Sequence, residues 1–231
     1  MIILVTGSSG FAGEIVIQKL QNYGYEVMGL DWKPGKFTNI IQDISKPFHV
    51  KGKIDVIIHL AARLEHERCS KEDFFSTNVN GTENLLEVAK ENNSYFIYIS
   101  TTAIYGNPES PITEATKISP NGYYGITKLK GEKVCQKYKD RLDIMVVRPS
   151  VLIGEKRLGI FNIIFKKLFS NSYIPILGNG KNRISFVNID DLAEFLVYLV
   201  QKRLKGLTIN FGGIVPGTLK EIIHDLELYS K

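Results

Sequence analysis

The residues with the clearest chemical potential are Tyr124 and Lys128, four positions apart in a segment with a helical pattern. Residues at i and i+4 share one face of a helix. A lysine ammonium beside a phenol stabilises the phenolate and lowers the pKa of the phenol from about 10. Such a pair exchanges protons with alcohol or sugar hydroxyls near neutral pH. The same spacing is common on helices without this chemistry, so a purely structural role stays open at this point.

A glycine-rich segment, Thr6 to Gly13, lies between a short apolar run and a helical pattern. Its G-x-x-G-x-x-G spacing differs from the commoner G-x-G-x-x-G, but its position favours a dinucleotide-binding loop over a plain turn. Glycines there permit a tight turn, a close approach to a pyrophosphate and close helix–strand packing, and the helix N-terminus adds N–H donors. The residues predicted to contact this cofactor are Gly7, Gly10, Phe11, Ala12 and Gly13.

Asp31 ends the second apolar run, near the spacing expected for a carboxylate that binds the adenosine ribose hydroxyls. A carboxylate there repels a 2′-phosphate, so the sequence favours NAD over NADP, although Lys33 is close enough to weaken this preference. The alternative roles for Asp31 are a solvated acid at the strand end or a helix cap.

Thr101 follows another apolar run, at the edge where parallel sheets bind ligands. Its hydroxyl is placed to hydrogen-bond the same substrate oxygen as Tyr124. The alternative is that Thr101 satisfies backbone groups at the end of the strand.

Short apolar runs alternate with helical patterns along the chain, which indicates a doubly wound α/β fold with a Rossmann-type parallel sheet. We expect a dinucleotide-binding domain over residues 1–150. A substrate-binding part over 151–231 is expected to interleave with the core and to form a small, reduced C-terminal lobe. The expected strands cover 2–6, 25–31, 54–59, 94–99, 142–148 and 207–211, and the expected helices cover 11–22, 67–92 (with a break), 122–139, 159–170, 190–203 and 218–229.

The composition of the chain argues against several classes of protein. The chain has 231 residues, 44% of them hydrophobic, and a net charge of +5 without a long basic run, which argues against nucleic-acid binding. Cys69 and Cys135 show no metal-ligand spacing, so we expect no metal, no disulfide framework and a reducing cytoplasm. No apolar stretch approaches the roughly 20 residues of a membrane span, so we expect a soluble protein.

These motifs together resemble the extended short-chain dehydrogenase/reductase family, in its NAD-dependent epimerase/dehydratase group. The resemblance covers about 220 residues. It rests on Thr6 to Gly13, Asp31, Asp43-Ile44, His59 to Ala62, Asn78 to Thr82, Ser100 to Gly106, Tyr124 to Lys128, Arg148-Pro149, Arg183 to Leu192 and Asn210 to Gly213.

The resemblance implies a role for each matching residue. Asp43 and Ile44 would contact the adenine, and Asn78 would support the nicotinamide side of NAD. Thr101, Tyr124 and Lys128 would form the catalytic triad, and Arg183 would contact a nucleotide diphosphate. Leu60, Ala61 and Ala62 would lie along the pyrophosphate and ribose. His59 is interpreted instead as a buried strand residue.

Two departures from the family pattern bear on the reaction. Dehydratases of the group carry Asp-Glu just after the catalytic threonine, where this chain has Thr102 and Ala103. Many nucleotide-sugar enzymes carry asparagine at the position of Val151, which weakens the diphosphate-binding interpretation. The chain is also short for the group, which is why a reduced substrate lobe is expected.

The function predicted from the resemblance is an NAD-dependent nucleotide-sugar epimerase or related sugar oxidoreductase, with a UDP-sugar as the expected substrate. One alternative is a dehydrogenase or reductase that acts on another hydroxyl or carbonyl compound. Another is an NAD-sensing protein without catalysis, against which Tyr124 and Lys128 argue. A homodimer is also expected, through a four-helix bundle built from the helix after Asn78 and the helix that bears Tyr124.

Overall fold

The computed structural model describes residues 1–65, 69–108, 111–154, 183–213, 217–218 and 220–221. The predicted helix at 159–170 lies outside this part of the chain, and so does most of the predicted helix at 218–229. None of the helices in the described ranges has the length and hydropathy that a membrane span requires.

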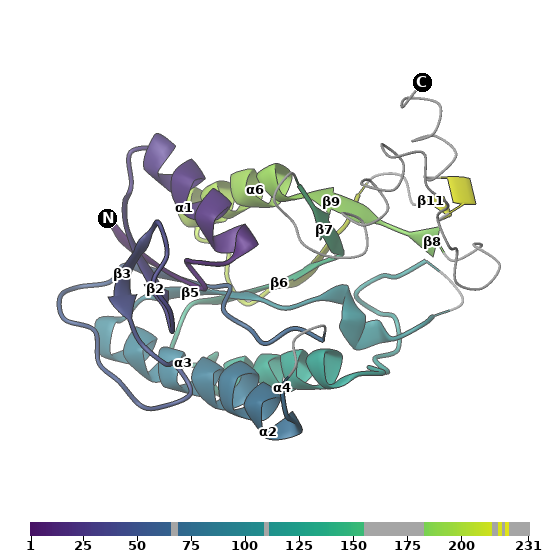
Figure 1. Ribbon diagram of the computed structural model, residues 1–231, viewed down its shortest axis with the longest axis horizontal. Helices are drawn as coiled ribbons and strands as arrows, with labels where there is room; N and C mark the ends of the chain where they lie inside the picture. Colours follow the sequence, from purple (N-terminus) through teal and green to yellow (C-terminus); the bar gives the residue numbers. More distant parts are fainter. Residues whose placement is uncertain (66–68, 109–110, 155–182, 214–216, 219, 222–231) are drawn as a thin grey trace.

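A seven-stranded sheet forms the centre of the molecule, and all its neighbouring strands pair in parallel (Figure 1). Its spatial order is β10-β6-β5-β4-β1-β2-β3. The strands are β1 Ile2–Thr6, β2 Glu26–Asp31, β3 Thr38–Ile41, β4 Val56–His59, β5 Tyr95–Ile99, β6 Ile144–Pro149 and β10 Thr208–Phe211. This arrangement confirms the predicted doubly wound α/β fold.

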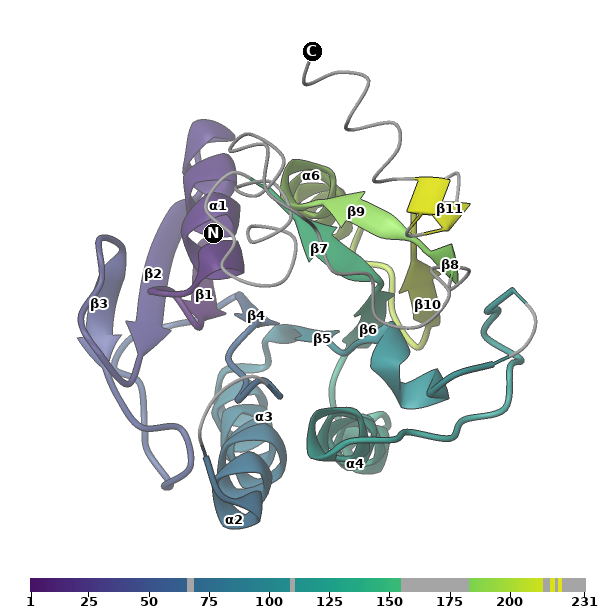
Figure 2. The same cartoon turned by 45° about the vertical axis from the view of Figure 1, so that its right-hand side comes forward.

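Helices cover both faces of the sheet (Figure 2). On one face lie α1 Phe11–Asn22 and α6 Ile189–Lys202; on the other lie α2 Lys71–Phe75, α3 Gly81–Asn92 and α4 Tyr123–Tyr138. Successive strand residues point to opposite faces. Ile3 and Val5 of β1 therefore join the core beneath α1 and α6, whereas Leu4 joins the core beneath α3 and α4. Burial on both faces explains why the strands read as continuous apolar runs.

Within residues 1–150 the structure adds two elements to the expected ones, and it shows where the break expected within 67–92 falls. The sequence analysis missed β3, because this edge strand has a partner on one side only and alternates half-buried with exposed residues. The helix expected over 67–92 is interrupted: Ser70 caps α2 through a capping box with Asp73, and a π-helical turn, Ser76–Asn80, precedes α3. A short 3₁₀ helix, Thr102–Tyr105, follows β5.

Several elements beyond residue 150 belong to the main body of the fold. β10 pairs with β6 at the end of the large sheet, and α6 packs beside α1. Two small sheets add β7 Val151–Ile153 with β9 Phe186–Asn188, and β8 Arg183–Ile184 with β11 Gly217–Thr218. The division of the chain into two parts at residue 150 stays a prediction.

The strand register brings the predicted site residues to one edge of the sheet. Thr6 at the end of β1 pairs with Leu30 on one side and with His59 on the other, and His59 lies opposite Tyr98. The loops that follow β1, β2, β4 and β5 therefore leave the sheet side by side at its carboxyl edge. The strand order reverses between β1 and β4, which is where open α/β sheets bind ligands.

Candidate functional site

The glycine-rich loop packs so closely against its neighbours that two of its positions require glycine. Gly7 has a φ of +75°, and a Cβ at this position would lie 2.9 Å from the backbone nitrogen of Ala61. A Cβ on Gly13 would lie 2.0 Å from the carbonyl oxygen of Gly7, so only glycine lets α1 pack this closely. Gly10 is the N-cap of α1 and brings no capping side chain. The positive end of the helix dipole therefore faces the edge where a pyrophosphate would bind.

Asp31 is held beside this loop. Its carboxylate, 6% exposed, accepts hydrogen bonds at Oδ2 from the backbone nitrogen of Ser9 at 3.0 Å and from its hydroxyl at 2.8 Å. The neighbouring Trp32 is 57% exposed, and the guanidinium of Arg63 lies 4.9 Å from its ring centroid. The Lys33 ammonium lies 5.8 Å from the same centroid. Two cations thus lie over the ring of Trp32, the residue that follows the carboxylate predicted to bind ribose.

His59 is a buried link between the strands and α3, as the sequence interpretation had it. Its Nδ1 lies 2.8 Å from the Thr6 hydroxyl, and its Nε2 lies 3.0 Å from the Thr82 hydroxyl. Burial, followed by the nearby charge of Lys128, holds the pKa of His59 well below its ordinary value. The Thr6 hydroxyl also accepts a hydrogen bond from the backbone nitrogen of Ala61 at 3.2 Å. His59 therefore stays neutral and helps to fix the loop of Leu60, Ala61 and Ala62.

The side chain of Asn78 holds the loop that follows β4 through the backbone of Arg63. Its Oδ1 accepts from the Arg63 backbone nitrogen at 2.7 Å, and its Nδ2 donates to the Arg63 carbonyl at 3.1 Å and to the Thr127 hydroxyl at 3.0 Å. Thr127 belongs to α4, so this buried amide joins the loop after β4 to the helix of the predicted proton donor.

The residues expected near the adenine follow β3. Asp43 is exposed, and its Oδ1 accepts from the backbone nitrogen of Ser45 at 3.0 Å. Ile44 is buried, and its carbonyl accepts from Nδ2 of Asn84 at 2.8 Å. The Gln42 backbone nitrogen donates to the carbonyl of Asp31 at 2.8 Å. The segment that precedes Asp43 is thereby held against the end of β2.

Tyr124 and Lys128 lie in the first two turns of α4. Lys128 is 1% exposed, and its Nζ lies 4.1 Å from the ring centroid of Tyr98. Burial lowers the pKa of Lys128 to about 7. Tyr124 is half-buried, and its backbone nitrogen donates to a Glu65 carboxylate oxygen at 2.9 Å. The sequence analysis missed Glu65, because no motif connects it with the helix.

Thr101 lies two residues beyond the end of β5 and caps the short 3₁₀ helix that follows, since its hydroxyl oxygen accepts from the backbone nitrogen of Ala103 at 3.1 Å. The backbone role left open by the sequence is therefore present. The same hydroxyl keeps its hydrogen for donation to another acceptor. The adjacent Ser100 hydroxyl is buried and has no hydrogen-bond partner among the described residues.

A buried ionic network supports α4 from behind. Arg148 of β6 makes a bidentate pair with Glu132, from Nε at 2.9 Å and from an outer nitrogen at 2.7 Å. Its other outer nitrogen donates to the Tyr105 hydroxyl at 2.6 Å, and that hydroxyl donates to Oδ1 of Asn210 at 2.9 Å. The network ties α4 to the 3₁₀ helix after Thr101 and to β10. The three predicted catalytic side chains are thus carried on elements that are joined to one another.

Arg183 is exposed on β8, opposite Thr218 of β11. The hydroxyl of Ser150, which follows β6, donates to the carbonyl of Ser185 at 2.9 Å, and the Ser150 backbone nitrogen donates to the Phe211 carbonyl at 2.9 Å. The strand that bears Arg183 is therefore attached near the carboxyl ends of β6 and β10, at the edge that carries the other predicted residues.

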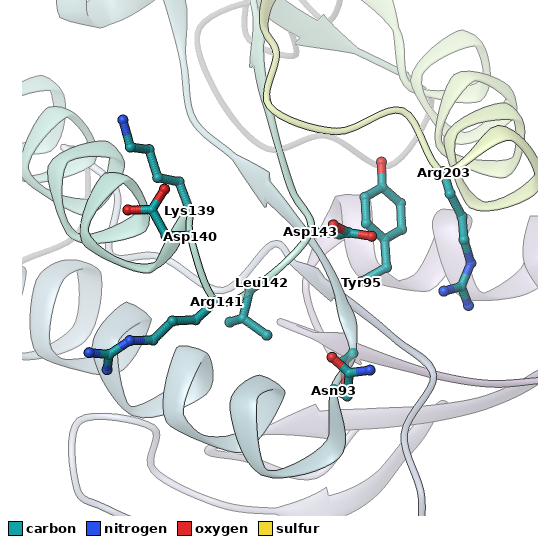
Figure 3. A pocket seen from close by; sticks show the side chains of 9 residues that line it. Asn93, Tyr95, Lys139, Asp140, Arg141, Leu142, Asp143 and Arg203 are labelled. Atoms are coloured by element: carbon teal, nitrogen blue, oxygen red, sulfur yellow. The ribbon is translucent and has the colours of Figure 1, made fainter.

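Two surface hollows flank the sheet. One, of about 260 Å³, is lined by polar side chains that include Tyr95, Asp143 and Arg203 (Figure 3). Tyr95 begins β5, so this hollow lies at the amino edge, opposite the predicted site. The other, of about 400 Å³, is lined by Tyr105 and by the following loop, including Asn107 and Asn121, on the carboxyl side. Within the described part of the chain, no three His, Cys, Asp or Glu side chains are grouped to hold a metal ion.

The burial of Lys128 predicts a stability that depends on pH. The folded-state pKa of about 7 lies below the ordinary value of 10.5. Below pH 7 the lysine is charged in the folded and in the unfolded protein, so the folded protein bears the full free-energy cost of burying the charge. Between pH 7 and pH 10.5 the folded protein releases the proton while the unfolded chain keeps it, so the cost of burial decreases as the pH rises. Lys128→Met is therefore expected to raise the free energy of unfolding by about 2 kcal/mol at pH 6, and by less at pH 9.

Urea denaturation of the cofactor-free protein at both pH values measures this effect. The control is Lys133→Met, which removes an exposed ammonium from the same helix and should leave stability unchanged at either pH. An equal rise in the free energy of unfolding of Lys128→Met at pH 6 and at pH 9 would contradict the expectation.

A family model, related sequences and solved structures all point to one protein family. Residues 3–212 match the family model described as the NAD dependent epimerase/dehydratase family. An uncharacterised protein of Sinorhizobium fredii is 33% identical over 95% of this chain, which spans 58% of that protein's length. An uncharacterised UDP-glucose epimerase of Bacillus subtilis is 28% identical, with 98% of this chain and 81% of the relative covered. The crystal structure of UDP-glucuronic acid 4-epimerase from Bacillus cereus in complex with NAD superposes with a TM-score of 0.88 at 30% identity, covering 100% of this chain and 83% of that one.

Proposed function

The chain belongs to the NAD-dependent epimerase/dehydratase family, and from this premise we propose that it is an NAD-dependent enzyme that epimerises a nucleotide sugar. The observation that carries the proposal is the convergence at one sheet edge of the glycine-rich loop, Asp31 and the helix of Tyr124 and Lys128. The proteins from Bacillus subtilis and Bacillus cereus described above are both named as epimerases of UDP-sugars, which supports a UDP-sugar substrate.

The residues present fit NAD. The cradle at Gly7 and Gly13 has no room for a Cβ, and Asp31 stands at the end of β2 beside it. Gly7, Gly10, Phe11, Ala12 and Gly13 would hold the pyrophosphate, Asp31 the ribose, and Asp43 with Ile44 the adenine. The chemistry that bound NAD would supply there is reversible hydride transfer.

The proton transfers fall to the protein. The Tyr124 phenolate takes the proton of the sugar hydroxyl, and the neighbouring Lys128 favours the ionised phenol. The Thr101 hydroxyl donates to the same substrate oxygen, because its own oxygen already accepts from Ala103. Tyr124 would return the proton to the same oxygen, and inversion at that carbon requires that the carbon be reduced on its other face.

The reaction type is argued from what the chain lacks and from what it carries. Thr102 and Ala103 occupy the positions of the dehydratase acid and base, so neither can move the proton that elimination of water requires. A dehydrogenase with net cofactor turnover is the second candidate, since the same Tyr124 and Lys128 chemistry serves it. A non-catalytic NAD sensor would have no use for that pair.

Product analysis on a panel of nucleotide sugars tests the proposal. We expect an epimeric mixture to form from a UDP-sugar without added NAD, together with cofactor retained through purification. Exchangeable cofactor and a stoichiometric change in NADH absorbance would instead identify a dehydrogenase. Absence of both conversion and NAD binding would refute an enzymatic function.

Cofactor choice follows from Asp31. NAD is expected to bind about tenfold more tightly than NADP, because the buried carboxylate accepts from a ribose hydroxyl and repels a 2′-phosphate. The preference is expected to be modest because two cations, Lys33 and the Arg63 guanidinium, lie over the ring of the adjacent Trp32. Trp32, the only tryptophan in the chain, is exposed next to Asp31, so its fluorescence can follow both titrations. Equal or tighter binding of NADP would remove this role from Asp31.

The quaternary structure and the cellular location stay predictions. We propose a homodimer through α3 and α4, which pack side by side on one face of the sheet. A cytoplasmic location is proposed because the two cysteines, Cys69 and Cys135, do not suggest a disulfide framework.

A further inference from the structure

We propose that Glu65 is a positioning residue for Tyr124. Its carboxylate joins the loop after β4, which would line the cofactor site, to the first turn of α4, which carries Tyr124. The loop runs from Leu60 to Glu65, directly after β4. It contacts the glycine-rich loop at its beginning and α4 at its end. It therefore connects the glycine-rich loop with the turn of α4 that carries Tyr124.

The beginning of the loop is attached to the phosphate cradle. The Ala61 backbone nitrogen lies so close to Gly7 that a Cβ there would be 2.9 Å from it. The same nitrogen donates to the Thr6 hydroxyl, which is itself held by His59. A shift of Ala61 would break these contacts, so this end of the loop moves only together with the glycine-rich loop.

The middle of the loop is attached to α4 through Asn78. This amide, 1% exposed, binds both the nitrogen and the carbonyl of Arg63 and then donates to the Thr127 hydroxyl. Thr127 in turn donates to the carbonyls of Tyr123 and Tyr124. The carbonyl side of the first turn is thereby fixed to the loop.

Glu65 fixes the nitrogen side of the same turn. A carboxylate oxygen accepts from the Tyr124 backbone nitrogen at 2.9 Å, across 59 positions of sequence. This nitrogen belongs to the first turn, whose N–H groups have no partner within the helix, and Gly122 as N-cap brings no side chain. A Cβ on Gly122 would lie 2.9 Å from both Glu65 oxygens, so the glycine makes room for the carboxylate.

The two attachments close a ring through Arg63, Asn78, Thr127, Tyr124 and Glu65. Through Asn78 the loop holds the first turn of α4 at Thr127. With Glu65 as well, the backbone of Tyr124 is held at two points from one loop. A proton transfer is sensitive to such placement, because displacement by about 1 Å can cost 10²-fold in rate. The inference rests on the proposed function, since it assigns a purpose to the position of Tyr124.

The test compares Glu65→Ala and Glu65→Gln with a matched carboxylate at the opposite edge of the sheet. Asp55 accepts from the backbone nitrogen of Ile2 at 2.8 Å, also between segments distant in sequence. We expect Glu65→Ala to lower kcat about tenfold while KM for the sugar and Kd for NAD change less than threefold. Glu65→Gln keeps an acceptor oxygen and should recover kcat to within about threefold of wild type. Asp55→Ala should lower Tm and leave kcat unchanged.

Each other outcome counts against the inference. If kcat of Glu65→Ala stays within twofold of wild type, or falls no further than that of Asp55→Ala, Glu65 does not position Tyr124. If KM for the sugar rises instead of kcat falling, Glu65 contacts the substrate directly. If Glu65→Gln is as impaired as Glu65→Ala, the charge matters and not the hydrogen bond. A wild-type protein without NAD binding or turnover would instead refute the proposed function, which keeps the two failures separate.

Discussion

Tyr124→Phe is expected to bind NAD as the wild type does and to lose turnover by about 10²–10⁴-fold, the range that a general acid–base group contributes. The phenyl ring remains to pack in its half-buried place, and the backbone contact with Glu65 does not involve the hydroxyl. The substitution therefore removes the proton-transfer group without disturbing the loop that lines the cofactor site.

The neighbouring residue supplies a control for this experiment. Tyr123 is 43% exposed, and its ring centroid lies 6.1 Å from that of Phe74. Tyr123→Phe removes one hydroxyl from the same turn of α4 and should leave turnover unchanged. Steady-state rates and NAD titrations of both variants give the comparison. Activity of Tyr124→Phe within twofold of the wild type would exclude Tyr124 from the mechanism.

Arg183→Ala is expected to weaken binding of UDP by about tenfold to hundredfold, the effect of one charge-assisted hydrogen bond. A guanidinium presents a planar fork of donors that matches a phosphate. Arg183 is exposed on β8, and the segment that follows it is held to Ser150 near the carboxyl end of β6. The side chain of Val151 has no amide group to donate, so we expect the arginine to carry more of the proposed diphosphate binding.

Calorimetric titrations of UDP and of NAD on both proteins measure the effect. The expected result is weaker UDP binding with NAD binding unchanged. Arg141→Ala provides the control, because Arg141 is an exposed arginine that lines the hollow at the opposite edge of the sheet (Figure 3). If the wild type binds neither UDP nor related nucleotides, the nucleotide-sugar proposal fails and the dehydrogenase becomes the first candidate.

Local patterns were enough to predict much of the fold, and they supply the candidate residues of the cofactor site. The glycine-rich loop and Asp31 depend on short-range spacing, because a strand, a tight turn and a helix follow one another directly in the chain. The six strands expected from apolar runs are present, and the four central ones, β1, β4, β5 and β6, are buried almost throughout, which requires apolar residues along the strand. β3 could not be recognised in this way, because an edge strand with exposed alternate residues lacks that pattern.

The sequence by itself thus determined which chemical groups are available and which of them share an element. Tyr124 and Lys128 lie on one helix face because of the helical period alone. Only the tertiary structure decided that Lys128 is buried against Tyr98 with a pKa of about 7, and that Glu65 reaches the backbone of Tyr124. The physical reason is that spacing along the chain controls contacts within one element. The environment of a charge, and a contact across 59 positions, depend on how β4, β5 and α4 pack together.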